Sequence, residues 1–158
     1  MIDTHAHIYL PAFKKDLDHV LDKASSAGVT DICMPAIDAQ SLNQMKSVSH
    51  PAIRFHKMAG LHPCEVNHRL PDLRSMLEPL LNEEEFIAVG ETGLDYYWSK
   101  DHIKEQKESF EVQLEMAKAF QKPIVIHNRN STEDMLALVE KHQDGRLSGV
   151  WHCFNGTL

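Results

Sequence analysis

The stretch Pro123-Ile124-Val125-Ile126-His127 contains the pattern from which the fold is predicted. Its three consecutive β-branched residues favour a short strand that is buried on both faces, and a histidine follows at the carboxyl end of that strand. A short apolar run followed by a polar residue recurs along the chain. The runs that we expect to form strands are Met1–His7, Val29–Pro35, Ile53–Ala59, Phe86–Glu91, Pro123–His127 and Ser148–Phe154.

Longer amphipathic stretches separate these runs and predict helices. In the clearest of them Phe110, Leu114 and Ala117 share one face, with Glu and Lys residues on the other. Before the last helix, Ser131 is expected to act as the N-cap. Strands that alternate with helices predict a parallel α/β sheet, either doubly wound or closed into a (β/α) barrel. The expected helices are Phe13–Ala27, Ser41–Val48, Leu73–Glu84, Lys104–Gln121 and Thr132–Lys141.

The positions of the ionisable residues favour the barrel. Asp3, His5 and His7 alternate with smaller residues, so the period of two places all three on one face of the first strand. Only a closed barrel brings the carboxyl ends of so many strands to one axis. The ionisable residues at the ends of the other strands are His62, Glu91, His127 and His152.

These strand-end residues have the chemistry of a metal centre. His5 and His7 are expected to bind one divalent ion and His127 and His152 a second, since neutral imidazoles are common metal ligands. Glu91 lies between the two pairs in strand order, and a carboxylate can bridge two cations about 3.5–4 Å apart. We therefore expect two divalent ions, with Mg²⁺, Mn²⁺ and Zn²⁺ all remaining open.

Composition limits the class of protein. The chain has 158 residues, of which 42% are hydrophobic and 25% charged, so we expect a single globular domain over residues 1–158. No stretch resembles a signal peptide or a membrane span, and three widely spaced cysteines do not suggest a disulfide framework. A cytoplasmic location without a membrane partner is therefore expected.

The net charge of −7 counts against a broad basic surface that would hold nucleic acid. Two divalent ions among neutral histidines and a single carboxylate would nevertheless leave a local positive surplus. A small site of this kind could attract one phosphate in an otherwise acidic protein.

Five sequence blocks together resemble the TatD family of metal-dependent deoxyribonucleases, and the resemblance covers the whole chain. It implies an amidohydrolase-like TIM barrel, exonuclease activity, and metal ligation by five residues. Related amidohydrolases often carry a carbamylated lysine where this chain has Glu91, which favours the TatD branch. The blocks are Asp3-Thr4-His5-Ala6-His7, Gly60-Leu61-His62-Pro63, Gly90 to Tyr97 (GETGLDYY), Pro123 to His127 and His152-Cys153-Phe154; the implied ligands are His5, His7, Glu91, His127 and His152.

The sequence departs from this family in one respect. The family's barrel has eight βα units and a further metal-site aspartate after the last strand, whereas this chain provides about the first six strands and five helices. We therefore expect it to correspond to the N-terminal part of a barrel. Either a C-terminal segment completes the barrel, or the open edges associate with another copy.

The predicted function is metal-dependent cleavage of phosphodiester bonds in DNA, with Glu91 and His62 as catalytic residues. Arg129 and Asp95 are expected to contact the substrate, although Asp95 could instead orient a ligand or cap a loop. Tyr96, Tyr97 and Trp98 could stack on bases or pack the loop over the fourth helix.

Two other functions remain open on these residues. The same centre could hydrolyse small esters or amides, or the chain could be an inactive fragment that acts through a partner.

Cys153, of opposite parity to His152, is expected to be buried against the helices.

Overall fold

The computed structural model describes residues 1–98 and 100–154. Its six strands form one sheet in which every neighbouring pair is parallel and the spatial order follows the chain order, β1-β2-β3-β4-β5-β6. The strands are β1 (Ile2–Asp3), β2 (Asp31–Met34), β3 (Arg54–Ala59), β4 (Phe86–Asp95), β5 (Ile124–Arg129) and β6 (Gly149–Trp151).

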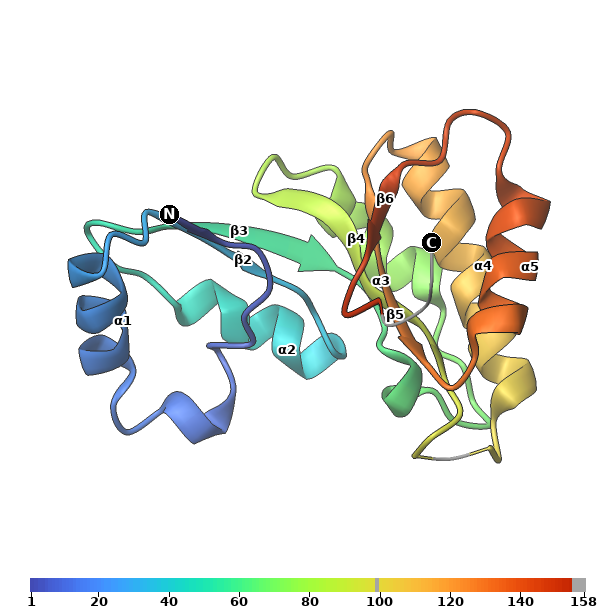
Figure 1. Ribbon diagram of the computed structural model, residues 1–158, viewed down its shortest axis with the longest axis horizontal. Coiled ribbons are helices and arrows are strands. Elements are labelled where there is room, and N and C mark those ends of the chain that lie inside the picture. The colour runs from blue at the N-terminus through green and yellow to red at the C-terminus, as the bar shows by residue number, and fades with distance from the viewer. Residues whose placement is uncertain (99, 155–158) are drawn as a thin grey trace.

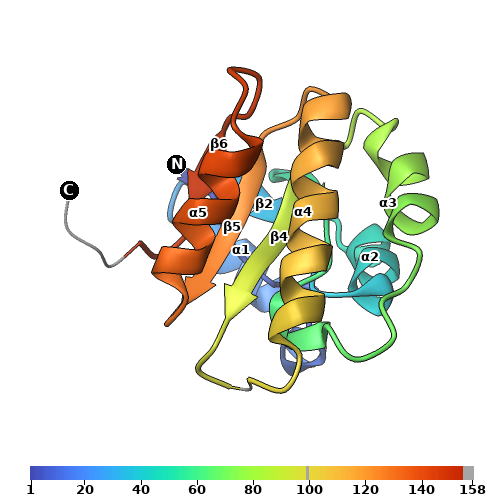
Figure 2. The same ribbon diagram turned by 90° about the vertical axis from the view of Figure 1, so that its right-hand side faces the viewer.

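The helices cover one face of this sheet. Parallel strands in consecutive order are joined by right-handed crossovers, which place every connecting helix on the same side. Figure 1 shows the sheet turning between β2–β3 and β4–β6, and Figure 2 shows α3, α4 and α5 lying over the outer face of its second half. The result is a curled half-barrel. The helices are α1 (Leu17–Ser26), α2 (Ala39–Gln44), α3 (Leu73–Leu81), α4 (Ile103–Ala119) and α5 (Thr132–His142).

The main hydrophobic core lies between the sheet and the helices. Phe86 of β4 and Phe110 and Leu114 of α4 are fully buried there. A second, smaller cluster lies on the concave face and is made by Cys33, Met58, Ala88 and Val125, one residue from each of four neighbouring strands. Buried apolar residues therefore lie on both faces of the sheet, as expected for parallel strands.

All predicted strands and helices are present, but several boundaries differ. β1 ends at Asp3 rather than His7, because the Asp3 carboxylate accepts the backbone N–H of His5 and turns the chain. β4 continues beyond Glu91 to Asp95, because this extension pairs with the last residues of β5. The first predicted helix, Phe13–Ala27, begins only at Leu17, and the 3₁₀ helix Pro11–Phe13 precedes it.

Helix α2 begins two residues earlier than expected and is shorter. Asp38 accepts the backbone N–H of Ser41 at 2.7 Å, and the Ser41 hydroxyl oxygen accepts the N–H of Asp38 in return. This capping box fixes the start of the helix. The chain then tightens into the 3₁₀ helix Met45–Ser47.

Of two expectations for single residues, one is confirmed in position only and the other is wrong. Ser131 stands at the N-cap position of α5, but its hydroxyl donates to the carbonyl of Leu94 at 2.9 Å and makes no cap bond. It thus connects α5 to β4 instead. Cys153 is exposed rather than buried, because β6 ends at Trp151 and strand parity no longer applies two residues later.

Among the described residues, no helix combines the length and the apolar character that a membrane crossing requires.

Candidate metal centre

Glu91 is the centre of a group of histidines at the carboxyl ends of the strands. Its side chain is buried, with the residue only 2% exposed. One carboxylate oxygen, Oε2, lies 3.0 Å from Nε2 of His5 and 3.4 Å from Nε2 of His7. The other, Oε1, lies 3.0 Å from Nδ1 of His127 and 3.9 Å from Nε2 of His62. Each oxygen therefore faces its own pair of imidazoles.

Close backbone contacts bring these strand ends together. A Cβ atom at Gly60, two residues before His62, would lie 2.7 Å from the carbonyl carbon of Gly90. Glycine at both positions allows the chain after β3 to approach β4 directly beside Glu91. The five histidines come from segments after β1, β3 and β6 and from β5 itself, so the centre depends on the curl of the whole sheet.

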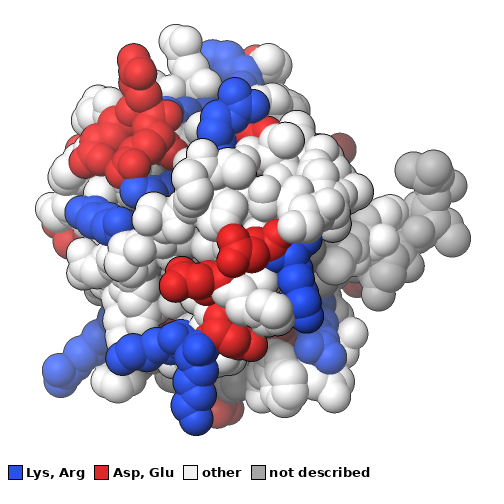
Figure 3. Space-filling view, turned by 90° about the vertical axis from the view of Figure 1, so that its left-hand side faces the viewer, with Lys and Arg blue, Asp and Glu red and all other residues white. Residues whose placement is uncertain are grey.

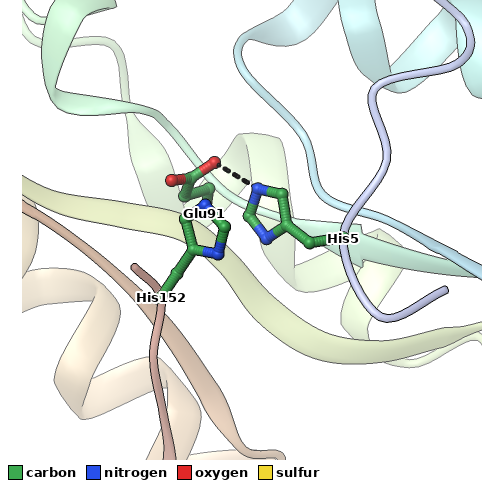
Figure 4. A group of neighbouring side chains, drawn as sticks. All are labelled: His5, Glu91 and His152. Atoms are coloured by element: carbon green, nitrogen blue, oxygen red, sulfur yellow. Dashed lines mark hydrogen bonds and ion pairs between the residues drawn. The ribbon is translucent and has the colours of Figure 1, made fainter. Parts of the chain in front are cut away.

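His152 lies on the His5 side of the centre. Figure 4 shows the imidazole rings of His5 and His152 next to Glu91. The two rings are stacked face to face, with centroids 3.6 Å apart and planes 6° from parallel. The side chains of His5, Glu91 and His152 offer ligand atoms that all lie within 4.8 Å of one another. A second group with the same property consists of His62, Glu91 and His127.

This grouping differs from the one expected from strand order. The prediction placed His127 with His152, because β5 and β6 are neighbours. The curl of the half-barrel instead brings the end of β6 round to the segment that follows β1, so His152 lies against His5.

A hydrogen bond fixes which nitrogen of the His7 ring faces the centre. The Tyr9 hydroxyl donates to the carbonyl of Pro35 at 2.7 Å and accepts from Nδ1 of His7 at 2.8 Å. The proton of His7 is then on Nδ1, and its Nε2 lone pair faces Glu91. Tyr9 was not among the predicted site residues, although it continues the period of two set by His5 and His7.

The other side of the centre is ordered in the same way. Nε2 of His127 donates to the Asp95 carboxylate at 2.9 Å, which leaves the Nδ1 lone pair directed at Glu91. His62 has the opposite arrangement, because its Nδ1 accepts the backbone N–H of Cys64 at 3.2 Å. Its neutral ring therefore carries the proton on Nε2, which points into the centre as a donor.

Burial and hydrogen bonds act in opposite directions on the ionisable groups. Burial alone would raise the pKa of Glu91, but the imidazoles of His127, His5 and His7, which donate to it when they are protonated, outweigh burial and hold this pKa well below its usual range. Burial lowers the pKa of His62 to about 4. The pKa of His127 is raised, because its hydrogen bonds to two carboxylates outweigh the effect of burial.

The donor set fits divalent cations. In these neutral tautomers the lone pair of His7 faces the Glu91 carboxylate, and that of His127 faces the carboxylate and the Nε2–H of His62, 3.2 Å away. Lone pairs gathered around a carboxylate form a donor set that suits a cation. Two ligand atoms that are each about 2.1 Å from a common cation lie about 3.0–3.4 Å apart. The contacts of Glu91 with His5, His127 and His7 are 3.0, 3.0 and 3.4 Å. The number and identity of the cations remain expectations from the sequence.

The two predicted substrate contacts lie in different environments. Arg129 is exposed at the end of β5, with its guanidinium carbon 3.8 Å from the centroid of the Tyr97 ring. Asp95 is 1% exposed, and both of its oxygens are occupied. Oδ1 accepts the backbone N–H groups of Tyr97 and Trp98, and Oδ2 accepts from His127. These contacts favour the alternative that Asp95 orients a ligand and fixes a loop.

The chain is similar to one protein family over nearly its whole length. The model of the family described as TatD related DNase matches residues 2–158. The "Uncharacterized metal-dependent hydrolase YabD" of Bacillus subtilis is 30% identical over 157 residues, which is 99% of this chain and 62% of that protein. The "3'-5' ssDNA/RNA exonuclease TatD" of Salmonella typhimurium is 29% identical over 99% of this chain and 60% of that protein.

A solved structure agrees with the fold. The crystal structure of YjjV, a TatD homologue from Escherichia coli, superposes with a TM-score of 0.88 at 28% identity. It covers 99% of this chain and 61% of the other chain. The half-barrel described above is thus of the TIM-barrel type predicted from the sequence, and this chain spans about three fifths of the length of the relatives it matches.

Proposed function

Because this chain belongs to the family of TatD-related DNases, we propose that it forms the metal centre of a hydrolase that cleaves phosphodiester bonds of single-stranded DNA, as an exonuclease. The observation that carries the proposal is the buried Glu91 carboxylate, whose two oxygens each face a pair of imidazoles. The name of the Salmonella relative, a 3'-5' ssDNA/RNA exonuclease, supports a single-stranded nucleic acid as the substrate.

The proposed ligands are those predicted from the sequence: His5, His7, Glu91, His127 and His152. Divalent cations held by them would polarise a phosphoryl oxygen and make water a stronger nucleophile at neutral pH. The protein's own contribution is positional. Tyr9 and Asp95 hold the rings of His7 and His127 in the tautomers that face Glu91.

His62 and Arg129 are proposed to act on the substrate itself. The Nε2–H of His62 points into the centre, 3.2 Å from Nδ1 of His127, and a phosphate oxygen bound there could take its hydrogen bond instead, which favours the catalytic role over ligation. The guanidinium of Arg129 offers a planar fork of donors that matches phosphate geometry.

The test is hydrolysis of a single-stranded oligodeoxynucleotide in the presence of Mg²⁺, Mn²⁺ or Zn²⁺. Glu91→Ala removes the one group that contacts both sides of the centre, so turnover should fall at least about 100-fold while the circular dichroism spectrum stays unchanged. Glu84→Ala, at an exposed carboxylate after α3, is the matched control. Near-normal turnover of Glu91→Ala with saturating metal would contradict the bridging role.

A second candidate is hydrolysis of small esters or amides by the same centre. The net charge of −7 favours it, and the face in Figure 3 carries basic and acidic side chains in a mixture rather than a continuous basic surface. Small ester and amide substrates assayed beside the oligonucleotide distinguish the two functions.

A further inference from the structure

Two exposed aromatic side chains closely follow Asp95, the hydrogen-bond partner of His127. Tyr97 is 54% exposed and Trp98 is 69% exposed, and they follow directly after β4. Their ring centroids are 5.0 Å apart with planes at 85°. Neither the candidate metal centre nor the main core uses these rings. Contiguous exposed apolar side chains of this kind can form part of a binding surface.

A cation completes this group. The guanidinium of Arg129, at the end of β5, lies 3.8 Å from the centroid of the Tyr97 ring and 5.3 Å from that of Trp98. Such a stacked guanidinium keeps its N–H groups at the edge of the ring, where they remain available to an anion. The three side chains, Tyr97, Trp98 and Arg129, are called the aromatic platform below.

The aromatic platform is fixed relative to the metal centre by one buried carboxylate. Oδ1 of Asp95 accepts the backbone N–H of Tyr97 at 2.9 Å and that of Trp98 at 3.1 Å. Oδ2 of the same side chain accepts from Nε2 of His127 at 2.9 Å, and His127 contacts Glu91. The Asp95 side chain thus connects the backbone of Tyr97 and Trp98 directly to the proposed ligand His127.

We propose that the aromatic platform is a subsite for one unpaired nucleobase of the substrate strand, with Trp98 stacking on the base and Arg129 holding the adjacent phosphate. This proposal rests on the proposed nucleolytic function. Every base offers a π-face, and only an unpaired base exposes it to a side chain. A protein of net charge −7 gains little from general attraction to phosphates, so stacking supplies an affinity that charge does not.

Binding is tested with the chain in the presence of its divalent cation and with a phosphorothioate-linked oligothymidylate, chosen to resist hydrolysis. The chain contains two tryptophans, so in a Trp151→Phe background Trp98 is the only one. The indole nitrogen of Trp151 has no hydrogen-bond partner among the described residues, so phenylalanine loses no bond there. We expect the oligothymidylate to quench Trp98 fluorescence, and an abasic phosphorothioate strand of equal length not to.

Variants assign the effect to the ring. In the wild-type background Trp98→Ala should weaken binding of the labelled oligothymidylate about 10-fold by anisotropy and leave binding of the abasic strand unchanged. Trp98→Phe should restore much of the loss. Leu136→Ala, at an exposed apolar position of α5, is the matched control. With cleavable DNA, Trp98→Ala should raise KM more than it lowers kcat.

Equal quenching by the two strands, equal loss of affinity for both, or no effect of Trp98→Ala would overturn the subsite. Absence of oligonucleotide binding would overturn it as well. Failure of the proposed function has a different result, because wild type and Glu91→Ala would then be equally inactive on cleavable DNA. The base-dependent difference in binding would still be measurable in that case.

Discussion

Two side chains near the metal centre each form a hydrogen bond with a histidine, at the ring nitrogen that does not face Glu91. The Tyr9 hydroxyl holds His7, and the Asp95 carboxylate holds His127, so that one lone pair of each ring faces Glu91. Such partners of ligating histidines commonly contribute 10- to 100-fold to metal affinity. We therefore expect Tyr9 to contribute to metal affinity, although it is not among the predicted site residues.

Tyr9→Phe should lower the affinity for the divalent cation about 10-fold, because His7 loses the acceptor that keeps its proton on Nδ1. The measurement is titration of the folded, metal-free chain with Mn²⁺ by calorimetry. Tyr96→Phe removes a comparable hydroxyl, which donates to Asp134 at 2.7 Å away from the centre, and should leave the affinity unchanged. Equal affinities of Tyr9→Phe and wild type would show that His7 is oriented by packing alone.

The sequence allowed the members of the histidine cluster to be predicted, but not their grouping. His5 and His7 are predicted from their alternation along the first run. His62, Glu91, His127 and His152 are predicted because each follows an apolar run, and strand ends converge in a curled parallel sheet. The neighbours of each ring depend on how far the sheet curls, which no local pattern encodes. Strand order therefore paired His127 with His152, whereas the structure stacks His152 on His5.

At the scale of elements, the junction of β4 and β5 determines the position of the centre. Gly93 of β4 has φ +143°, and a Cβ atom there would lie 2.0 Å from the carbonyl oxygen of His127. The two strands pair without interruption from Thr92 to Asp95 of β4. The extension of β4 beyond Glu91 could not be predicted, because Thr92-Gly93 has the composition of a turn and forms a strand only through its pairing with β5.

Gly93→Ala should destabilise the chain by more than about 3 kcal/mol and weaken cation binding, because the methyl group must separate β4 from β5 beside His127. Chemical denaturation gives the free energy of unfolding. Gly145→Ala is the matched control, since Gly145 also has a positive φ, +89°, but a Cβ atom there would have nothing within 4 Å. That variant should cost only about 1–2 kcal/mol of backbone strain.

A charged cluster joins the amino-terminal ends of β2 and β3, which lie away from the metal centre. Asp31 accepts from Nε of Arg54 at 2.8 Å and Nη2 at 3.0 Å, from Nε2 of His56 at 2.8 Å and from the Thr30 hydroxyl at 2.8 Å. Hydrogen bonds from Arg54, His56 and Thr30 hold the pKa of this carboxyl well below its usual range. The ionised form is therefore favoured by folding.

Asp31→Asn should destabilise the chain more at neutral pH than in acid. A carboxyl whose pKa is depressed on folding contributes its stability above the pKa of the unfolded state, about 4, and loses it as the pH falls towards the folded value. The difference in the free energy of unfolding between wild type and Asp31→Asn should be constant above about pH 5 and shrink below about pH 4. Urea denaturation at several pH values measures it. A difference independent of pH would show that the cluster contributes no ionic stabilisation.

At the scale of the whole molecule, the consecutive strand order leaves two edges. Within the described residues β1 and β6 each have a single neighbouring strand, so their outer backbone groups lack ladder partners. The concave face between them holds a cavity of about 440 Å³ with a largely apolar lining that includes Ile87, Val125 and Val150. The relatives that this chain matches are longer, and this chain spans 60–62% of them.

The 158-residue chain by itself should self-associate through these edges. Val150 lies on β6, is 61% exposed and lines the concave cavity, so Val150→Lys places an inward-pointing charge at an open edge. This variant should shift the molar mass measured by light scattering towards the monomer. Leu136→Lys, at a 51% exposed position of α5 away from the edges, should not. A monodisperse wild-type monomer that cleaves DNA fully would show that the half-barrel needs neither another copy nor a further segment.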